Sequence, residues 1–329
     1  MPTASFTPRG PFSLAASIRY LEGFTPASYD HAGDDVLRMA FPADDAHHVI
    51  GCALRQKAAA GRPAAVHAEF TLHSDDSPAP TAATAAQDAA RAQIARILSL
   101  DVDGTGFPAL AEHDRVVASL QADYPGLRPV CFYSPYEAAA WTVIGNRIRR
   151  TQAAAIKARI ARDHGQAIDV AGQNVSAFPT PAVLRTLEHI PGLTEIKIER
   201  LHAIAEAAPE GRLDAAALRA QEPEQALQDL QQLPGIGPFS AELILIRGAG
   251  HPDVFPTAEP RVHRAMATEY RLGDEAADDH GRLAGIAEDW CPYRSWVALL
   301  LRVRAQDQVT EHHGRSSHRE HHGEQPHSA

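Results

Sequence analysis

The stretch that decides the fold is residues 231–259, QQLPGIGPFSAELILIRGAGHPDVFPTAE. Its opening, LPGIG at residues 233–237, predicts a tight turn between two helices. Pro234 ends the first helix, because its ring removes an amide donor and clashes with the preceding turn. Gly235 and Gly237 permit backbone angles that other residues avoid, and they let a ligand approach the main chain.

A second helix and a carboxylate follow this turn. The apolar residues of Phe239–Arg247 have helical spacing. The amides at the start of that helix predict an anion site that suits a phosphate. Glu259 follows about one helix and one loop later.

The composition describes an ordinary soluble protein with enough residues for two or three modules. Of 329 residues, 44% are hydrophobic and 22% are charged. We expect no membrane span and no signal peptide, and we predict a cytoplasmic protein. Cys52, Cys131 and Cys291 lie far apart in sequence and favour buried, reduced thiols over disulfides.

The net charge of −10 argues at first against a nucleic-acid partner. Residues 125–304, however, hold 20 basic and 22 acidic side chains, a net charge of only −2. Residues 143–162 contain basic side chains and no acidic one. This run is either a solvated helix face or a surface that faces phosphates. Its basic residues are Arg147, Arg149, Arg150, Lys157, Arg159 and Arg162.

The first 112 residues predict a small module of strands and helices. Alternating and β-branched residues predict strands over 36–41, 47–55 and 65–73. An alanine-rich helix is expected over 82–98, and residues 12–24 mix a short strand with a helix.

Helical patterns dominate from about residue 113 onward. A long helix is predicted over 136–162, with Ser134 as its cap. The last amphipathic helix is expected over 290–304. The polar tail, 305–329, is expected to be disordered; its six histidines match no compact metal site.

The hairpin and its trailing carboxylate resemble the helix-hairpin-helix (HhH-GPD) DNA glycosylase superfamily. They resemble most closely its DNA-3-methyladenine glycosylase II branch, over about residues 10–304. The resemblance implies an α+β fold: an N-terminal antiparallel sheet domain with helices (1–112), followed by an all-α helix-hairpin-helix glycosylase domain (113–304). It also implies a monofunctional, monomeric enzyme of base excision repair, associated with the nucleoid, that releases a flipped damaged (alkylated) base from double-stranded DNA.

The resemblance makes Glu259 the catalytic residue, where the family has an aspartate. A carboxylate there stabilises the positive charge that develops on the sugar when the base leaves. The longer stem of glutamate shifts the carboxylate by about 1.5 Å, one C–C bond. Pro260 restricts the backbone at Glu259 to extended angles.

The resemblance also assigns a base pocket with fewer aromatic side chains than the branch usually has. Phe239 stands where bifunctional relatives have a lysine nucleophile, so we expect no strand cleavage. Leu243 and Arg302 occupy positions where the branch has aromatics, whereas Trp296 lies in a segment that matches it well. An aromatic cleft attracts cationic alkylated bases, so selectivity for such bases is in question here. Arg302 is expected either to hydrogen-bond a neutral or oxidised base or to pair with Glu259.

The DNA contacts implied by the resemblance come from two places. Arg147 stands where relatives insert a wedge into the DNA gap, and it either fills that gap or contacts a phosphate. The other implied DNA-binding residues are Asn146, Gly235, Gly237, Phe239 and Ser240.

No cofactor is required by this chemistry. The resemblance implies a structural Na⁺ or K⁺ on the main-chain carbonyls of Gln231, Leu233 and Ile236. Three cysteines are too few for the four-cysteine iron-sulfur cluster of some superfamily members.

The sequence is also compatible with two other function classes. The chain is alternatively a catalytically weakened protein that binds DNA lesions with the same fold. A more remote alternative is a hydrolase of nucleotides or other small glycosides, which would lack a steep salt dependence of duplex binding.

Overall fold

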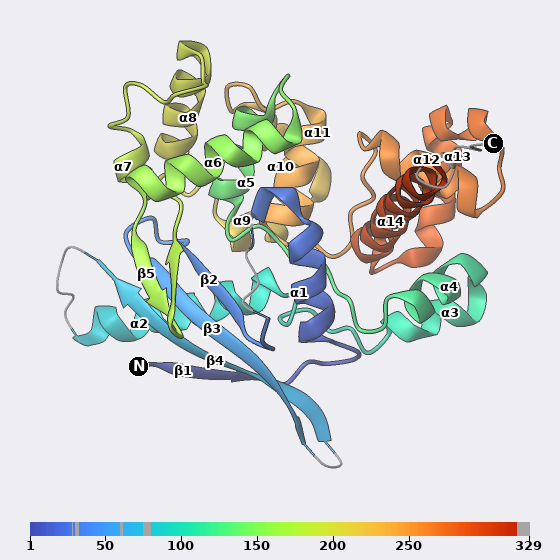
Figure 1. Ribbon diagram of the computed structural model, residues 1–329, viewed down its shortest axis with the longest axis horizontal. Coiled ribbons are helices and arrows are strands. Elements are labelled where there is room, and N and C mark those ends of the chain that lie inside the picture. Colours follow the sequence, from blue (N-terminus) through green and yellow to red (C-terminus); the bar gives the residue numbers. More distant parts are fainter. Residues whose placement is uncertain (28, 30–32, 60–61, 75–79, 321–329) are drawn as a thin grey trace, which may run out of the picture.

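The computed structural model describes residues 1–27, 29, 33–59, 62–74 and 80–320. A strand layer lies at one end of the molecule, one group of helices stands above it, and a second group that includes the C-terminal helix lies beside the first (Figure 1). The α+β class predicted from the sequence is confirmed.

The strand layer is a four-stranded antiparallel sheet with the order β1-β4-β3-β2. The three strands predicted from alternation are present, and a fourth strand at the N-terminus was not predicted. In the ladder between β2 and β3, Met39 lies opposite Cys52. The strands are β1 (Thr3–Phe6), β2 (Leu37–Pro42), β3 (Val49–Ala59) and β4 (Arg62–His73).

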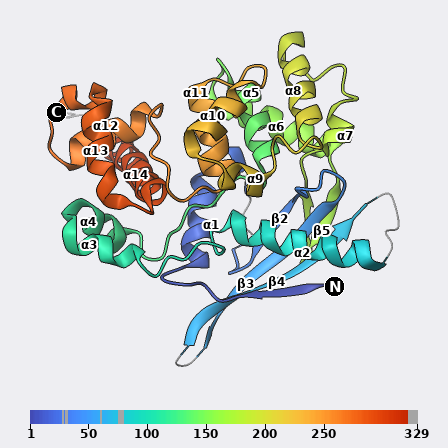
Figure 2. The ribbon, with the colours of Figure 1, turned by 180° about the vertical axis from the view of Figure 1, so that it is seen from behind.

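Helices α1 (Leu14–Gly23) and α2 (Pro80–Ile97) cover one face of this sheet. Figure 2 shows α2 running across the strands. Met39 and Phe41 point into this layer, as period-2 alternation requires, and both are fully buried. Residues 12–24 form only helix α1, capped by Ser13, and the short strand expected there is absent.

A strand pair interrupts the helical part of the chain and was not predicted. Strands β5 (Ala167–Val170) and β6 (Gln173–Ser176) join through Ala171 and Gly172, which have φ of 50° and 79°. Their Ile168 and Val170 pack on the second face of the sheet. The hairpin thus connects the helical part to the N-terminal sheet.

The remaining chain is helical. The predicted cap Ser134 accepts a hydrogen bond from a main-chain amide of the following helix, and Thr180 and Asp214 cap their helices in the same way. The helices before the helix-hairpin-helix turn at 233–237 are α3 (Leu110–His113), α4 (Arg115–Asp123), α5 (Pro135–Gly145), α6 (Arg150–His164), α7 (Pro181–Leu184), α8 (Glu195–Ala207), α9 (Ala215–Ala220) and α10 (Pro223–Gln231). Those that follow it are α11 (Pro238–Leu243), the π-helical turn η3 (Ile244–Gly248), α12 (Pro260–Glu269), α13 (His280–Ala287) and α14 (Arg294–Glu320).

The single helix predicted over 136–162 is wrong, because α5 and α6 are separate helices. Arg147 between them adopts a left-handed backbone conformation, with φ of 56°. The Nζ of Lys197 donates to the carbonyls of Ile144 and Asn146 at 2.8 Å each. Because Lys197 satisfies these two carbonyls, the chain can turn there without leaving them unpaired.

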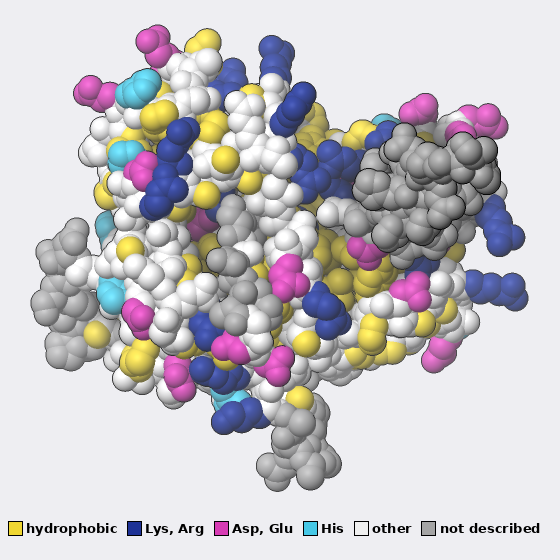
Figure 3. Space-filling view, in the orientation of Figure 1, with side chains coloured by type: hydrophobic (Ala, Val, Ile, Leu, Met, Phe, Trp, Pro, Cys, Tyr) yellow, Lys and Arg dark blue, Asp and Glu magenta, His cyan; other side chains and the backbone are white. Residues whose placement is uncertain are grey.

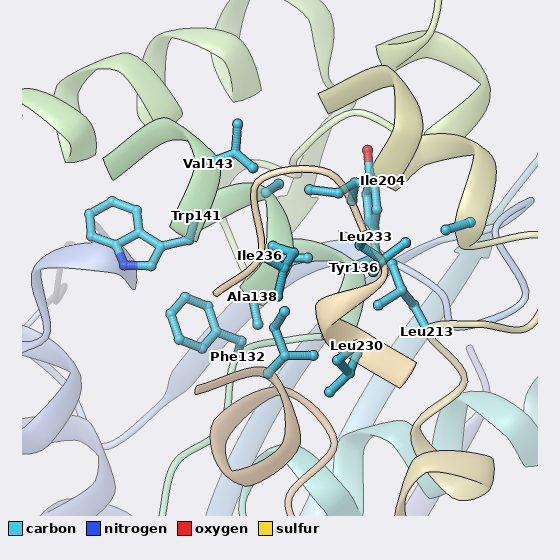
Figure 4. Packing of buried hydrophobic residues seen from close by; sticks show 14 of the residues in the cluster. Phe132, Tyr136, Ala138, Trp141, Val143, Ile204, Leu213, Leu230, Leu233 and Ile236 are labelled. Atoms are coloured by element: carbon cyan, nitrogen blue, oxygen red, sulfur yellow. The ribbon is translucent and has the colours of Figure 1, made fainter. Parts of the chain in front are cut away.

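The helix-hairpin-helix turn is fixed by its apolar side chains. Leu233 and Ile236 are buried, and Figure 4 shows them among residues of α5 and α8, such as Tyr136 and Ile204. Gly235 has φ of +86°, the region that favours glycine. Gly237, in contrast, is extended, so its backbone does not require glycine.

The final helix corrects the predicted tail boundary. Helix α14 begins at Arg294 and continues to Glu320, so residues 305–320 are helical where disorder was predicted. Arg304 bonds to Glu269 at 3.0 Å and to Asp123 at 2.5 Å, which anchors the helix beyond its first turns. Residues 321–329 lie outside the described part of the chain.

Two further expectations concern the membrane and the cysteines. Among the described residues, no helix combines the length and the apolar character that crossing a bilayer requires. Cys52 and Cys131 are buried free thiols, as predicted. Cys291 is also free, but it is exposed, contrary to the prediction.

Candidate active site

A cavity of about 790 Å³ lies beside the hairpin turn. Figure 3 shows a hollow between the two helical groups, with hydrophobic side chains in its floor and basic side chains along its upper rim. Its walls come from α1, α5, α11, the segment around 256–262 and α14. Segments that are far apart in sequence therefore share one chamber.

Glu259 lines this cavity at the start of α12. It is the N-cap residue: its carboxylate accepts a hydrogen bond from the Arg261 amide at 3.2 Å. The backbone at Glu259 is extended, with φ of −107° and ψ of 90°, as the following Pro260 predicts. The side chain is 17% exposed.

Arg302 of α14 lies beside Glu259 in the cavity wall. Its Nε lies 3.9 Å from the Glu259 Oε2, which is a loose ion pair. Burial lowers the pKa of Arg302, and the carboxylate of Glu259 opposes that shift. The charges of Arg261 and Arg150 also lower this pKa, so three guanidinium groups cluster around one carboxylate.

Glu242 of α11 holds the segment that leads to Glu259. It also lines the cavity and is only 5% exposed. Its Oε1 accepts hydrogen bonds from the Thr257 amide at 2.9 Å and from the Thr257 hydroxyl at 2.6 Å. Its Oε2 accepts one from the Ala258 amide at 2.9 Å. The backbone just before Glu259 is therefore tied to the helix after the hairpin.

Asp253 ties the beginning of the same segment to α14. Its carboxylate accepts hydrogen bonds from the Arg294 Nε at 2.8 Å and the Arg294 Nη2 at 3.0 Å. Burial works against the charged form, but the bonds from Arg294 and Cys291 outweigh it and hold the pKa of Asp253 below its ordinary value. Asp253 is therefore a structural carboxylate.

The aromatic part of the cavity wall comes largely from outside the hairpin. Tyr20 and Phe24 of the α1 region stack with ring centroids 5.4 Å apart. Phe132 meets Phe24 edge-on at 5.3 Å, and Trp141 of α5 lines the same chamber. The guanidinium of Arg247 lies over the Phe24 ring at 4.9 Å and over the Tyr20 ring at 5.3 Å.

The chain is similar in sequence to known DNA glycosylases. No protein-family profile matches the chain. A DNA-3-methyladenine glycosylase of Bacillus subtilis is 28% identical over 210 residues, which are 61% of this chain and 67% of that protein. DNA-3-methyladenine glycosylase 2 of Escherichia coli is 28% identical over 187 residues, 55% of this chain and 62% of that protein. The chain thus spans 44–67% of the length of the curated relatives it matches.

Solved structures with the same fold cover most of the chain. A 3-methyladenine DNA-glycosylase from Archaeoglobus fulgidus superposes with a TM-score of 0.72 at 20% identity, over 92% of this chain and 98% of that one. The chain resembles the helix-hairpin-helix DNA glycosylase superfamily in sequence and in fold, as the sequence predicted. Within that superfamily it is similar to the DNA-3-methyladenine glycosylase II branch. An 8-oxoguanine glycosylase/lyase of Clostridium acetobutylicum in complex with DNA is more distant, with a TM-score of 0.52 at 16% identity, over 79% of this chain and 86% of that one.

Most of the residues that the superfamily resemblance singled out gather at the cavity. Phe239 stands out among them because 44% of its surface is exposed, a large fraction for an aromatic side chain. Those that line the cavity are Asn146, Gly235, Gly237, Phe239, Ser240, Leu243, Glu259 and Arg302.

The other predicted site residues lie elsewhere. Trp296 is buried against Phe107 and Arg128 and does not line the cavity, so its assignment to the base pocket is wrong. The Trp296 ring packs against the rings of Phe107 and Tyr293 in the core instead. Arg147 is exposed beyond the end of α5, next to the cavity residue Asn146.

The carbonyl positions assigned to a monovalent cation belong to the turn itself. Gln231 is exposed at the end of α10, whereas Leu233 and Ile236 are buried in the core. The Leu233 carbonyl already accepts a hydrogen bond from the Ile236 amide at 3.1 Å. No cluster of three metal-ligating side chains occurs within the described ranges.

Several cavity residues were missed by sequence reasoning. Glu242 had a visible signal, because it is an acidic residue inside the apolar run Phe239–Arg247. Tyr20 and Phe24 had one too, since a spacing of four residues places them on one face of a helix. The sequence alone does not place that face against the hairpin.

Proposed function

We propose that this protein is a monofunctional DNA glycosylase of base excision repair, which hydrolyses the N-glycosidic bond of a flipped damaged base in double-stranded DNA. The observation that carries the proposal is the position of Glu259. Its carboxylate lines a chamber that also contains the hairpin residues Gly235 and Phe239. The chamber is large enough to admit a base, which must leave the duplex stack before its bond can be reached.

The chemistry needs a negative charge near the sugar. As the base leaves, positive charge develops on the sugar, and the Glu259 carboxylate stabilises it and orients the attacking water. The hydrogen bonds that the Glu242 carboxylate accepts from Thr257 and Ala258 hold the segment before Glu259 in place. The geometry is thereby set before the substrate binds, which is the condition for effective electrostatic catalysis.

A strand-cleaving mechanism lacks its nucleophile. Phe239 occupies the position of the lysine that forms a Schiff base in bifunctional relatives. An exposed aromatic ring at the cavity edge can stack on the flipped base but cannot attack the sugar. We therefore propose base release without a strand break.

The proposed DNA path crosses the hairpin and the end of α5. The main-chain N–H groups of Gly235, Gly237, Phe239 and Ser240 would contact phosphates. Arg147 would enter the gap left by the flipped base. The exposure of Arg147 and the fixing of the neighbouring carbonyls by Lys197 support this assignment. A Na⁺ or K⁺ on the carbonyls of Gln231, Leu233 and Ile236 would add affinity for phosphate. The protein would act as a monomer in the cytoplasm, on nucleoid DNA.

The proposal is tested with duplexes that each carry one alkylated, deaminated or oxidised base. Released base and abasic sites are measured, with and without alkali. At least one lesion should yield abasic sites that break only after alkali treatment. Strand breaks without alkali would contradict the monofunctional assignment, and no release from any duplex would contradict the enzymatic one.

A second candidate is a lesion-binding protein with weakened catalysis. The loose pair between Arg302 and Glu259 favours it, because a nearby cation offsets part of the carboxylate charge. This candidate predicts tight binding to a lesion duplex with no base release. In that case Glu259→Asp would increase turnover, whereas in a tuned enzyme the same change would decrease it.

A further inference from the structure

The charges around Glu259 are unbalanced. Arg302 lies 3.9 Å from that carboxylate, and Arg150 and Arg261 lie within electrostatic reach of both. All of them line the cavity. Three guanidinium groups thus share one carboxylate that is free to face a ligand.

The other carboxylates of the cavity wall already have partners. Glu242 accepts hydrogen bonds from the segment at 257–258. Asp123 pairs with Arg304 at 2.5 Å, and Asp307 accepts a hydrogen bond from the Tyr124 hydroxyl at 2.8 Å. Asp123 is therefore already paired with a cation, whereas Glu242 and Asp307 have neutral donors and keep their charge. Among the described residues, none of these three acids forms an ion pair with Arg302.

The aromatic wall is also already engaged by a cation. Tyr20 and Phe24 would attract a positively charged base through their ring faces. Arg247 already lies over both rings, at 5.3 and 4.9 Å. An incoming cation would therefore add a second positive charge beside the first.

We infer that the cavity selects a neutral damaged base that carries a carbonyl oxygen, and that Arg302 discriminates against positively charged N-alkylated bases. This inference rests on the proposed function, because it names the substrate class of the same site. A guanidinium has five N–H donors and no acceptor. Within the described residues the guanidinium of Arg302 donates no hydrogen bond, and its loose ion pair leaves these donors available to a carbonyl oxygen.

The test separates charge from shape with two non-cleavable duplexes. One carries 7-methylguanine on a 2′-fluorinated sugar, which is a cationic base with a stabilised glycosidic bond. The other carries 7-methyl-7-deazaguanine on the same sugar, which keeps the shape and the carbonyl but is neutral. Affinities are measured relative to an undamaged duplex. Wild-type protein should bind the neutral probe about tenfold more tightly, because like charges at an interface disfavour the wrong partner.

Two variants test whether Arg302 causes the preference for the neutral probe. Arg302→Met should reduce the preference at least threefold, chiefly by improving binding of the cationic probe. Arg264→Met removes an exposed arginine of α12 that does not line the cavity, and it should leave the preference unchanged. Circular dichroism and thermal unfolding check that both variants are folded. If Arg302→Met is unfolded, Arg302→Lys serves instead; it keeps the charge and should keep the preference.

Equal affinity of wild-type protein for the two probes, or tighter binding of the cationic one, would overturn the inference. An Arg302→Met variant with an unchanged preference would also overturn it. Base release from natural lesions is measured separately. Loss of release with a retained preference would contradict the proposed catalysis alone, so the two failures are distinguishable.

Discussion

The Oε1 of Glu242 accepts hydrogen bonds from both the amide and the hydroxyl of Thr257, two residues before Glu259. A residue on the helix after the hairpin thereby shapes the segment that presents the candidate catalytic carboxylate. The helix-hairpin-helix turn and the candidate catalytic carboxylate are thus linked through one buried side chain.

Glu242→Gln should weaken this coupling. One acceptor oxygen becomes an NH₂ donor, which cannot accept from the Thr257 or Ala258 amides. The free energy of unfolding should fall by about 1–3 kcal/mol, the cost of an unsatisfied buried group. A displacement of Glu259 by about 1 Å should slow single-turnover base release by roughly 10²-fold. Glu224→Gln, at an exposed position on α10, is the matched control; a rate loss of the same size there would contradict the coupling.

Asp253→Asn tests the link to α14 and its pH dependence. The folded-state pKa of Asp253 is depressed, so its contribution is present above the unfolded pKa of about 3.8 and is lost as pH falls through the lower folded value. At pH 7 the variant should lose about 1.5–3 kcal/mol of unfolding free energy, as expected for hydrogen bonds to a charged group. The difference from wild type should shrink below pH 4. Urea titrations at pH 7 and pH 3 measure it, and a difference that grows on acidification would contradict the assignment.

Breaking the buried ion pair between Lys157 and Glu137 should strongly destabilise the protein. Their Nζ and Oε2 lie 3.0 Å apart, and the Glu137 side chain is 1% exposed. Its Oε1 has no hydrogen-bond partner among the described residues. Lys157→Met should therefore reduce the free energy of unfolding by about 3–5 kcal/mol, because it leaves a buried carboxylate unpaired.

The double variant Glu137→Gln/Lys157→Met checks this reasoning. It removes the charge that the single variant leaves unpaired, so it should recover part of the stability. Denaturant unfolding of the single and double variants measures the recovery. A double variant less stable than Lys157→Met would show that packing, and not the unpaired charge, dominates.

Phe239→Ala tests the exposed ring beside the cavity. The ring is 44% exposed, so its loss should change stability little. Affinity for a lesion duplex should fall by about 1–3 kcal/mol if the ring stacks on a base. Ile196→Ala removes an exposed apolar side chain of α8 outside the cavity and should leave affinity unchanged. Fluorescence anisotropy with a labelled duplex compares the variants.

Local patterns predicted the elements whose signals are local. Residues 36–41 alternate, and β2 forms there; Ser134 precedes Pro135, and α5 begins there. The break after α5 was missed because its stabilising contact comes from Lys197, more than fifty residues away in the sequence. Strands β5 and β6 are each only four residues long and depend on the face of another sheet, so their own alternation was too short to identify them.

Some residues of the candidate site could be predicted from local sequence signals, and others could not. The turn and Glu259 could be located because the LPGIG signal and the later carboxylate lie within one stretch of chain. Trp296 was misplaced because the resemblance of its segment does not fix the direction of its ring. The cation cluster was invisible, since Arg150, Arg261 and Arg302 come from three different helices. Tertiary folding alone brings them to one carboxylate.

The most direct test of the account compares single-turnover base release by wild-type protein and Glu259→Gln. The substrate is the duplex from which the wild type releases its damaged base fastest. The amide keeps the size of the side chain and removes its charge. The account predicts a rate loss of at least about 10²-fold, comparable to the removal of one electrostatic stabiliser elsewhere, with lesion binding retained. Equal rates for the two proteins would contradict the catalytic role of Glu259.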